Sequence, residues 1–483
     1  MRSSSVNADL DRRKRWLALM VLCLGVLMIV LDTTIVNVAL PSIRDDLKFS
    51  ETALVWVVNA YMLTFGGFLL LGGRLGDLYG HRRLFVAGIA LFTVASLACG
   101  LAQSQAMLVA ARAVQGLGGA VVSAVSLSLI MMLFPEQEDR AKAMGVYGFV
   151  CAGGGSIGVL LGGFLASVLS WHWIFLVNLP IGAAVYGLCM ALLPAKGGQP
   201  GERLDMAGAA AITASLMLAV YAVVNGNERG WTSFHTLGLL GAAAVLLAAF
   251  LAIESRVRAP LMPLGLFRLR NVATANAAGV LWAAAMFAAF FISALYLQVV
   301  LGYSPMQVGL AFLPANVIMA VFSLGLSARL VMRFGIRAPL ACGLAVASVG
   351  LALFARAPIQ GDFLIDVLPA MSLLGLGAGV AFNPMLLAAM NDVDPRDAGL
   401  ASGVVNTSFM MGGALGLAVL ASLAAARTNF LLERGAAQVA ALNGGYQMAF
   451  ALGAACGAVA AVLCAMLLRP PAAARAGDSA STA

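Results

Sequence analysis

Gly73-Arg-Leu-Gly-Asp-Leu-Tyr-Gly-His-Arg82 is a charged, glycine-marked stretch between two long apolar runs, and it occurs twice in the chain. A less similar copy is Ala328-Arg-Leu-Val-Met-Arg-Phe-Gly-Ile-Arg337, with Arg, Leu, Gly and Arg at the same offsets. A second motif repeats as well, since Gly154-Gly155-Ser-Ile-Gly158 matches Gly412-Gly413-Ala-Leu-Gly416. The two pairs of copies are 255 and 258 residues apart, which predicts a chain built from two related halves.

The composition places most of the chain in lipid. Of 483 residues, 62% are hydrophobic and 10% are charged, and the mean hydropathy is +0.96. A soluble protein carries about 25% charged residues. The charges cluster between apolar runs of roughly 18–25 residues, the length that an α-helix needs to cross a bilayer. We therefore predict an all-α integral membrane protein. The Ala- and Gly-rich composition indicates a bacterial source, and so the bacterial cytoplasmic membrane.

Fourteen spans are predicted, beginning near residues 16, 52, 84, 105, 141, 174, 206, 236, 272, 304, 338, 364, 399 and 446. The positive-inside rule tests this count. With both termini in the cytoplasm, 22 of the 29 Lys and Arg residues fall on the cytoplasmic side, six fall outside, and Arg112 remains within the membrane. The net charge of +8 therefore lies at membrane edges beside lipid head groups, which argues against a nucleic-acid partner.

The repeat divides these spans into six, two and six. We predict a cytoplasmic N-terminal cap at 1–15, a six-helix bundle at 16–193, a linker with two extra transmembrane helices at 194–271, a second six-helix bundle at 272–468 and a disordered cytoplasmic tail at 469–483. Two bundles that rock against each other around a site near the membrane midplane are the architecture of a secondary transporter.

Asp32 is the one acidic residue predicted deep inside a span. It precedes Pro41 by nine residues and so lies roughly 13 Å below the outer surface. A carboxyl group at that depth is costly to insert and usually marks an ion or substrate pathway. Burial favours its neutral form, as a reversible proton carrier requires. The alternative is a packing role, with Asp32 hydrogen-bonded to a threonine or to backbone.

Arg112 is predicted in the fourth span at a matching depth, about 10–14 Å from the outer end. A guanidinium group there favours the charged carboxylate. Gln115 and Gly116 follow on the same helix face, where they offer a hydrogen-bond partner and space. The alternative role of Arg112 is to hold helices together. Whether Arg112 touches Asp32 depends on how the helices are placed.

Four motifs in order carry a family resemblance: Leu31-Asp-Thr-Thr-Ile-Val-Asn-Val-Ala-Leu-Pro41, the Gly73–Arg83 turn, Arg112-Ala-Val-Gln-Gly116 and Trp171-His-Trp-Ile-Phe-Leu-Val-Asn-Leu-Pro180. Together they resemble the signatures of the major facilitator superfamily, and specifically its fourteen-span drug/proton antiporter (multidrug efflux) branch. The resemblance covers residues 15–468. It implies a role in proton coupling for Asp32 and in proton transfer for Arg112.

The resemblance also implies a latch on the cytoplasmic side. Its residues are those of the turn (Gly73, Asp77, Gly80, Arg82 and Arg83), in which Asp77 holds the halves together. Arg140 is a further partner for this carboxylate. The helix N-terminus that follows Asp394-Pro-Arg396-Asp397 is another, because its dipole attracts anions. The alternative is a solvated turn that only ends the helix.

A glycine run in the fifth span is predicted to act as a gate. Its members include Gly154, Gly158, Gly162 and Gly163, whose spacing permits close helix approach and bending. The run resembles the antiporter motif of the family, with Val159 where that motif has a proline.

Asparagines mark the predicted cargo site. In the second half, four spans carry one each at depth (Asn276, Asn316, Asn383 and Asn406), in the spans whose counterparts line the cavity in the resembled fold. Asn37, Gln115 and the aromatic Trp282 complete the predicted substrate-binding set. The alternative is that these amides serve as interhelical contacts, worth about 0.6 kcal/mol each.

These features favour proton-driven export of hydrophobic or amphipathic small molecules, with a proton symporter that imports a nutrient as the alternative. No phosphate-binding loop or His-Glu-x-x-His motif occurs, and the three histidines lie at span edges, so an enzyme, a cofactor or a metal site is not expected. The seven cysteines show no paired spacing, so neither a disulfide nor a zinc site is predicted. A monomer in contact with lipid, protons and its cargo is expected.

Overall fold

The computed structural model describes residues 2–134, 136–193, 205–257, 260, 262, 264–390, 393 and 398–469, and these residues contain helices and no strand. The first half contains α1 (Arg2–Leu47), α2 (Glu51–Tyr79), α3 (His81–Gly100), α4 (Gln105–Leu133), α5 (Gln137–Val168), α6 (Trp173–Leu176) and α7 (Asn178–Leu192), followed by α8 (Met206–Arg229) and α9 (Phe234–Glu254). The second half contains α10 (Arg270–Leu295), α11 (Pro305–Val321), α12 (Ser327–Phe334), α13 (Arg337–Phe354), α14 (Leu368–Met390), α15 (Ala398–Glu433) and α16 (Gln438–Leu467). Short segments join them: a 3-10 turn η1 (Leu264–Arg268) and the π-helices η2 (Tyr296–Val300), η3 (Phe322–Leu326) and η4 (Phe363–Val367).

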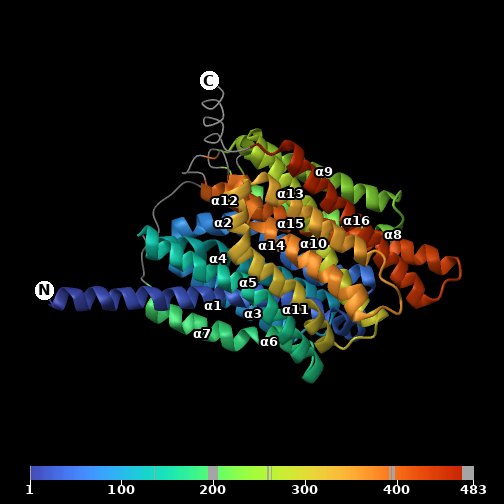
Figure 1. The fold of residues 1–483 in the computed structure, drawn as a ribbon, viewed down its shortest axis with the longest axis horizontal. Coiled ribbons are helices and arrows are strands. Elements are labelled where there is room, and N and C mark those ends of the chain that lie inside the picture. Colours follow the sequence, from blue (N-terminus) through green and yellow to red (C-terminus); the bar gives the residue numbers. More distant parts are fainter. Residues whose placement is uncertain are drawn as a thin grey trace.

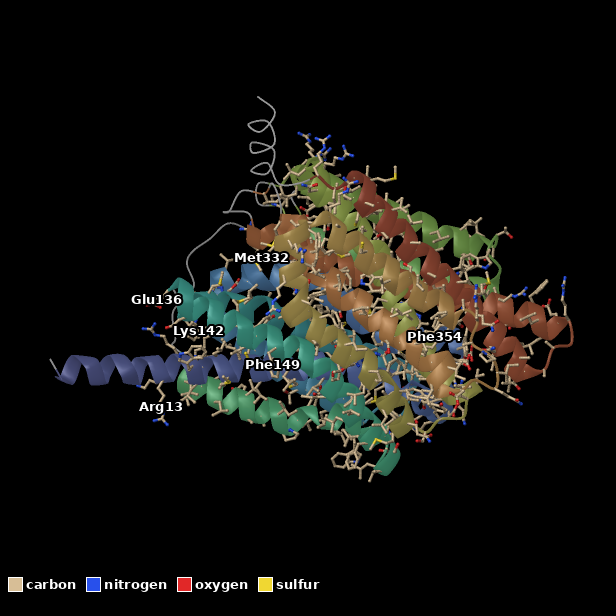
Figure 2. All side chains as sticks on the ribbon, viewed as in Figure 1. Arg13, Glu136, Lys142, Phe149, Met332 and Phe354 are labelled. Carbon is tan, nitrogen blue, oxygen red and sulfur yellow. The ribbon has the colours of Figure 1, made fainter. Side chains whose placement is uncertain are left out.

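The helices run side by side along the long axis of the molecule (Figure 1). We call the end where α1 begins and α16 finishes the terminal end, and the opposite end the loop end. Figure 2 shows Arg13, Glu136 and Lys142 at the terminal end and Phe354 toward the loop end. The neighbouring Arg15 forms an exposed ion pair with Glu136 at 3.4 Å. The masked linker 194–204 and tail 470–483 lie outside the described residues, so the predictions for them stay predictions.

The predicted all-α membrane fold is confirmed. Thirteen helical stretches are long and apolar enough to cross a membrane, and Pro305–Val321 is a shorter apolar helix at the position of the remaining expected span. It is short because the π-helix η3 interrupts it before α12. At the N-terminus the predicted cap and first span form one helix, α1, because residues 2–24 contain no glycine or proline that would end it.

The two halves repeat the same helix packing. Both copies of the charged turn keep a glycine with positive φ, Gly80 at 93° and Gly335 at 73°, a conformation that side-chain-bearing residues rarely adopt. In the first half, Gly158 of α5 faces Thr34 of α1. In the second half, Gly416 of α15 faces Ala284 of α10. Helix α1 is therefore related to α10 by 250 residues, the separation of Thr34 and Ala284.

The fourth span of each half repeats in the same way. Gly118 of α4 packs against the backbone of Phe92 in α3. Gly377 of α14 packs against the backbone of Ala347 in α13. A Cβ at either glycine would overlap that backbone, so both contacts depend on the missing side chain. Helix α4 is related to α14 by 259 residues.

Two seams join the halves, one where α5 meets α11 and one where α2 meets α15. The first is tight toward the loop end, where a Cβ on Gly163 would lie 2.8 Å from the carbonyl oxygen of Pro305. Toward the terminal end, Gly145, Gly148 and Gly153 of α5 face open space. This seam therefore parts toward the terminal end of the molecule.

The seam between α2 and α15 stays closed along its length. Asn59 donates a hydrogen bond to the carbonyl oxygen of Ala414 at 2.9 Å. Nearer the terminal end, Gly66 contacts Met410, and Gly403 contacts Leu70. The inserted helix α8 packs over this seam against α2 and α15, and α9 packs on α8, along one edge of the bundle (Figure 1).

Candidate functional site

Asp32 and Arg112 form an ion pair in the interior of the first half. The Nη1 atom of Arg112 on α4 lies 2.5 Å from the Oδ2 atom of Asp32 on α1. Their side chains are 0% and 1% exposed, so neither faces lipid. Arg112 also donates from Nε to the carbonyl oxygen of Val57 on α2 at 2.9 Å. The guanidinium group thus ties three helices together around one carboxylate.

The second oxygen of Asp32 is held by two amides. Gln115 donates to Oδ1 at 2.7 Å from one helical turn beyond Arg112, and Asn178 of α7 donates to it at 3.2 Å. Gln115 also donates to Ser96 Oγ on α3 at 2.8 Å and accepts from Arg112 Nη1 at 2.7 Å. Hydrogen bonds and an ion pair therefore satisfy both oxygens of an ionised Asp32 without water, as a buried charge requires.

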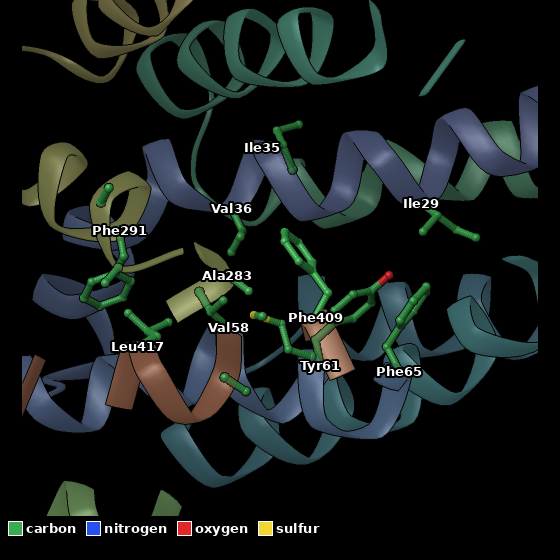
Figure 3. Close-up of a cluster of buried hydrophobic side chains, with 14 of the residues drawn as sticks. Ile29, Ile35, Val36, Val58, Tyr61, Phe65, Ala283, Phe291, Phe409 and Leu417 are labelled. Carbon is green, nitrogen blue, oxygen red and sulfur yellow. The ribbon is translucent and has the colours of Figure 1, made fainter. Parts of the chain in front are cut away.

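Aromatic rings cover the guanidinium group. The ring centroid of Tyr61 on α2 lies 4.4 Å from Arg112 Cζ, and that of Phe175 on α6 lies 5.6 Å from it. Tyr61 also stacks on Phe65 with centroids 5.7 Å apart. Figure 3 shows Tyr61 beside Phe409, which belongs to α15 in the other half. Tyr61 is thus a wall between the ion pair and the interface of the halves.

The Tyr61 hydroxyl group is buried and has no hydrogen-bond partner among the described residues. Such a group normally finds a partner in the interior of a protein. Its ring stays in contact with Arg112 while its hydroxyl is available to a group that enters the interface.

Sequence reasoning did not assign Tyr61, Ser96 or Asn178 to the site. Asn178 lies in the Trp171–Pro180 motif, so that motif was a signal for it. Ser96 and Tyr61 are single polar residues in apolar runs, and only the helix arrangement brings them to Asp32. The predicted pairing in depth of Asp32 with Arg112 becomes a direct contact in the structure.

The predicted glycine gate lies where α5 meets two neighbours. Gly154, Gly158 and Gly162 face α1, and a Cβ at Gly162 would lie 2.9 Å from the carbonyl oxygen of Ile35. Gly163 faces the start of α11 instead. Val159 presents its carbonyl oxygen to Gly309 of α11, so the position that carries proline in the resembled motif contributes backbone to the seam.

The predicted latch is described in part. Gly80 joins α2 to α3, and Gly73 faces α4, its nearest neighbour atom being the Cβ of Ala124. Arg82 donates to the carbonyl oxygen of Met190 at 2.8 Å, and Arg83 is exposed. The side chains of Asp77 and Arg140, and all of residues 394–397, lie outside the described residues, so the latch contact itself stays a prediction.

The predicted cargo residues are spread over several environments. Asn316 is 4% exposed, its Nδ2 atom has no described partner, and its Oδ1 faces Gly155 at the α5–α11 seam. Asn276 is equally buried and donates to the carbonyl oxygen of Val272 at 2.9 Å. Asn383 is half-buried and donates to the carbonyl oxygen of Ser323 at 2.7 Å.

The remaining predicted cargo residues do not join these amides. Asn406 is exposed, and Asn37 donates within α1 to the carbonyl oxygen of Thr33 at 3.3 Å. Gln115 is committed to Asp32, as described above. Trp282 is 2% exposed and packs near Gly457 of α16, inside the second half. Of the predicted set, Asn316 is the one whose free amide the structure places at the α5–α11 seam.

The repeat shows what the second half carries at the position of the ion pair. The 250-residue relation places Trp282 where the first half has Asp32. The 259-residue relation places Met371 where it has Arg112, and Leu374 where it has Gln115. All three are buried, at 2%, 0% and 3% exposure. The charged network is therefore confined to one half, and the equivalent space in the other is apolar.

Metal-ligand chemistry finds no support in the described side chains. They contain no group of three or more His, Cys, Asp or Glu that could hold an ion. The described cysteines are free thiols.

Comparisons with known proteins agree with this arrangement. The sequence profile of the Major Facilitator Superfamily matches residues 22–417. The chain is 38% identical over 463 residues to the puromycin resistance protein pur8 of Streptomyces alboniger, covering 94% of this chain and 92% of that protein. It is 39% identical to the cephamycin export protein CmcT of Amycolatopsis lactamdurans, covering 85% of each. It is 38% identical to the multidrug resistance protein Stp of Mycobacterium tuberculosis, covering 87% of this chain and 78% of that protein.

A solved structure shares the fold. It is the crystal structure of a bacterial homologue of the human lysosomal transporter Spinster, in an inward-facing and unoccupied conformation. The TM-score is 0.64 at 16% sequence identity, covering 94% of this chain and 97% of that one. The duplicated halves, the buried network between α1 and α4 and these relatives lead to one assignment: the chain belongs to the major facilitator superfamily.

Proposed function

We propose that this protein is a proton-coupled antiporter that exports hydrophobic or amphipathic small molecules across a bacterial cytoplasmic membrane. The relatives named for drug resistance and export support the cargo class. The observation that carries the proton coupling is the buried Asp32–Arg112 pair, which is the charged network of the spanning core. In this proposal the terminal end faces the cytoplasm, and the protein works as a monomer without a cofactor.

Proton binding changes the number of contacts that Asp32 makes. The ionised carboxylate accepts from Arg112, Gln115 and Asn178, which joins α1 to α4 and α7. A protonated carboxyl group loses its charge attraction for Arg112 and turns one acceptor into a donor. Arg112 still has the carbonyl oxygen of Val57 and the Tyr61 ring, so its charge stays partly compensated. Protonation thus loosens α1 from α4 without leaving a charge stranded.

Tyr61 links this chemistry to the cargo. Its ring covers Arg112 and its free hydroxyl group lies toward the other half. A cargo that binds between the halves meets Tyr61 and the aromatic pair Phe287 and Phe409, whose centroids are 5.7–5.8 Å or less from a ring neighbour. An apolar aromatic surface with few amide groups suits a planar, hydrophobic cargo. Cargo binding and Asp32 protonation then compete through the position of Tyr61.

Opening alternates between the two ends of the molecule. The halves meet at the loop end, where Gln298 donates to the carbonyl oxygen of Val38 at 2.9 Å and Met306 N donates to Ser167 Oγ at 3.0 Å. The α5–α11 seam parts toward the terminal end, which corresponds to an inward-facing state under the proposed topology. In the opposite state, the latch residues Asp77 and Arg140 would close the cytoplasmic side.

Transport into inverted membrane vesicles tests the proposal. With the lumen acidified, the wild-type protein should accumulate ethidium in the lumen and dissipate the proton gradient as it does so. Asp32→Asn should abolish both signals. Asp45→Asn is the matched control, because Asp45 lies on the same helix with a side chain that is 69% exposed.

The direction of flux separates the alternatives. A nutrient symporter would carry its cargo out of the acidic lumen together with protons. Gradient-driven accumulation that survives in Asp32→Asn would remove Asp32 from the proton path, and transport that ignores the gradient would refute antiport altogether.

A further inference from the structure

A cavity of about 520 Å³ lies at the terminal end of the second half, away from the Asp32 network. It is bounded by the start of α10, the turn between α12 and α13, and the ends of α14 and α16. Under the topology proposed above, this is the cytoplasmic edge of the membrane, where the acyl chains of the inner leaflet meet the head groups.

Two guanidinium groups line this cavity. Arg337 and Arg469 are both exposed, and neither side chain forms an ion pair or a hydrogen bond with any described residue. None of the described lining residues is acidic. Arg337 is also the first residue of α13, whose N-cap Ile336 offers no side-chain acceptor. The free N–H groups of that helix start add to the positive potential of the two arginines.

The rest of the lining is apolar. Ala341, Ala388, Ala465 and Leu468 contribute its walls, and Phe334 stands at 55% exposure on its rim. An inorganic anion would gain nothing from such walls. A molecule with an anionic head and a hydrocarbon body would use both parts of the site.

The first half shows why Arg337 is free. The repeated turn gives Arg337 the position that Arg82 has in the first half, and Arg82 donates to the carbonyl oxygen of Met190 near the end of α7. In the second half, Asn271 takes over the end of the last helix by pairing its amide with both backbone groups of Arg469. Arg337 therefore keeps the turn position without the internal acceptor that occupies its counterpart.

We propose that this cavity binds the head group of an anionic phospholipid of the inner leaflet, with Arg337 and Arg469 on the phosphate and the apolar walls against an acyl chain. Guanidinium groups suit phosphate oxygens because they present several donors in one plane. The proposal depends on the cytoplasmic placement of the terminal end, and it is independent of whether Asp32 carries protons.

Native mass spectrometry of the purified protein tests this with dioleoylphosphatidylglycerol against dioleoylphosphatidylcholine. The wild-type protein should retain phosphatidylglycerol in preference. Arg337→Gln/Arg469→Gln should bind it about 30-fold more weakly, the loss expected for two basic groups near a lipid surface. Arg427→Gln/Arg434→Gln is the matched control, since it removes two arginines from the loop end and should leave binding unchanged.

Cys342 provides a second readout in the unmodified protein. It lines the cavity and is exposed, whereas Cys23, Cys99, Cys189 and Cys464 are buried. Phosphatidylglycerol should slow alkylation of Cys342 by N-ethylmaleimide, and glycerol 3-phosphate or inorganic phosphate at the same concentration should not. Protection by phosphate alone would replace the lipid by a free anion. Equal phosphatidylglycerol binding by the cavity and control variants would overturn the proposal.

Discussion

The two halves of this transporter share a helix arrangement and differ most at one pair of equivalent positions. The first half places Asp32, Arg112 and Gln115 between α1 and α4, and the second half places Trp282, Met371 and Leu374 in the same space. Both solutions are buried and satisfied, one by hydrogen bonds and charge, the other by apolar packing. The difference indicates that one half carries the ion chemistry while the other provides a stable body against which it moves.

The largest effect is expected when the first half is given one residue of the second. Arg112→Met installs the side chain found at position 371 and leaves Asp32 buried without its cation. Removing one partner of a buried ion pair costs about 3–5 kcal/mol, so a large loss of thermal stability in detergent is expected.

The double variant Asp32→Asn/Arg112→Met is the control for that experiment. It removes both charges and should recover most of the lost stability, because no uncompensated ion remains. A double variant that is less stable than Arg112→Met would show that the pair does not act as a unit.

Exchanging Gln115 with its counterpart is the next test. Gln115→Leu removes a donor to the Asp32 carboxylate and one to Ser96, at an expected cost of about 1.5–3 kcal/mol. Leu374→Gln brings an amide into an apolar site with no partner and should also destabilise. Thermal unfolding of both variants measures these effects. Unchanged stability in either would mean that the two sites are less different than their contacts indicate.

A smaller difference is expected between the two equivalent glycines. Gly158→Ala meets the hydroxyl end of Thr34, which can rotate, whereas Gly416→Ala meets the backbone of Ala284, which cannot. Overpacking typically costs about 1–3 kcal/mol, and Gly416→Ala should lie at the upper end of that range. The ratio of folded protein after heating measures it, and a greater loss for Gly158→Ala would contradict the reading of these contacts.

The smallest effect concerns the contact between the halves at the loop end. Gln298→Ala removes one interhelical hydrogen bond, worth about 0.6 kcal/mol in a membrane protein, and so shifts the balance of orientations about threefold. Hydrogen exchange of residues 305–312 should rise. Gln447→Ala is the control, because Gln447 makes the same type of bond to Ala357 within one half. Equal changes in both variants would assign the effect to local packing.

The sequence was sufficient for the helix count, the duplication and the depth of Asp32 and Arg112, because each depends on apolar length or on spacing along a single helix. It could not show that these two side chains touch, since that depends on how α1 and α4 pack. For the same reason it missed Ser96 and Tyr61. Trp282, predicted to face the cargo, turns into the second half, because periodicity does not reveal which neighbour a uniformly apolar helix faces.

The π-helix η3 has a consequence for how the cytoplasmic side can open. Its widened turn places the carbonyl oxygen of Ser323 against Asn383, and the regular ladder resumes at Ser327 in α12. The eight residues of α12 are thereby a separate segment, able to tilt without pulling on Pro305–Val321. Loosening the inner rim and breaking the outer contacts are then two independent steps, and a cargo leaving by either route need overcome only one barrier at a time.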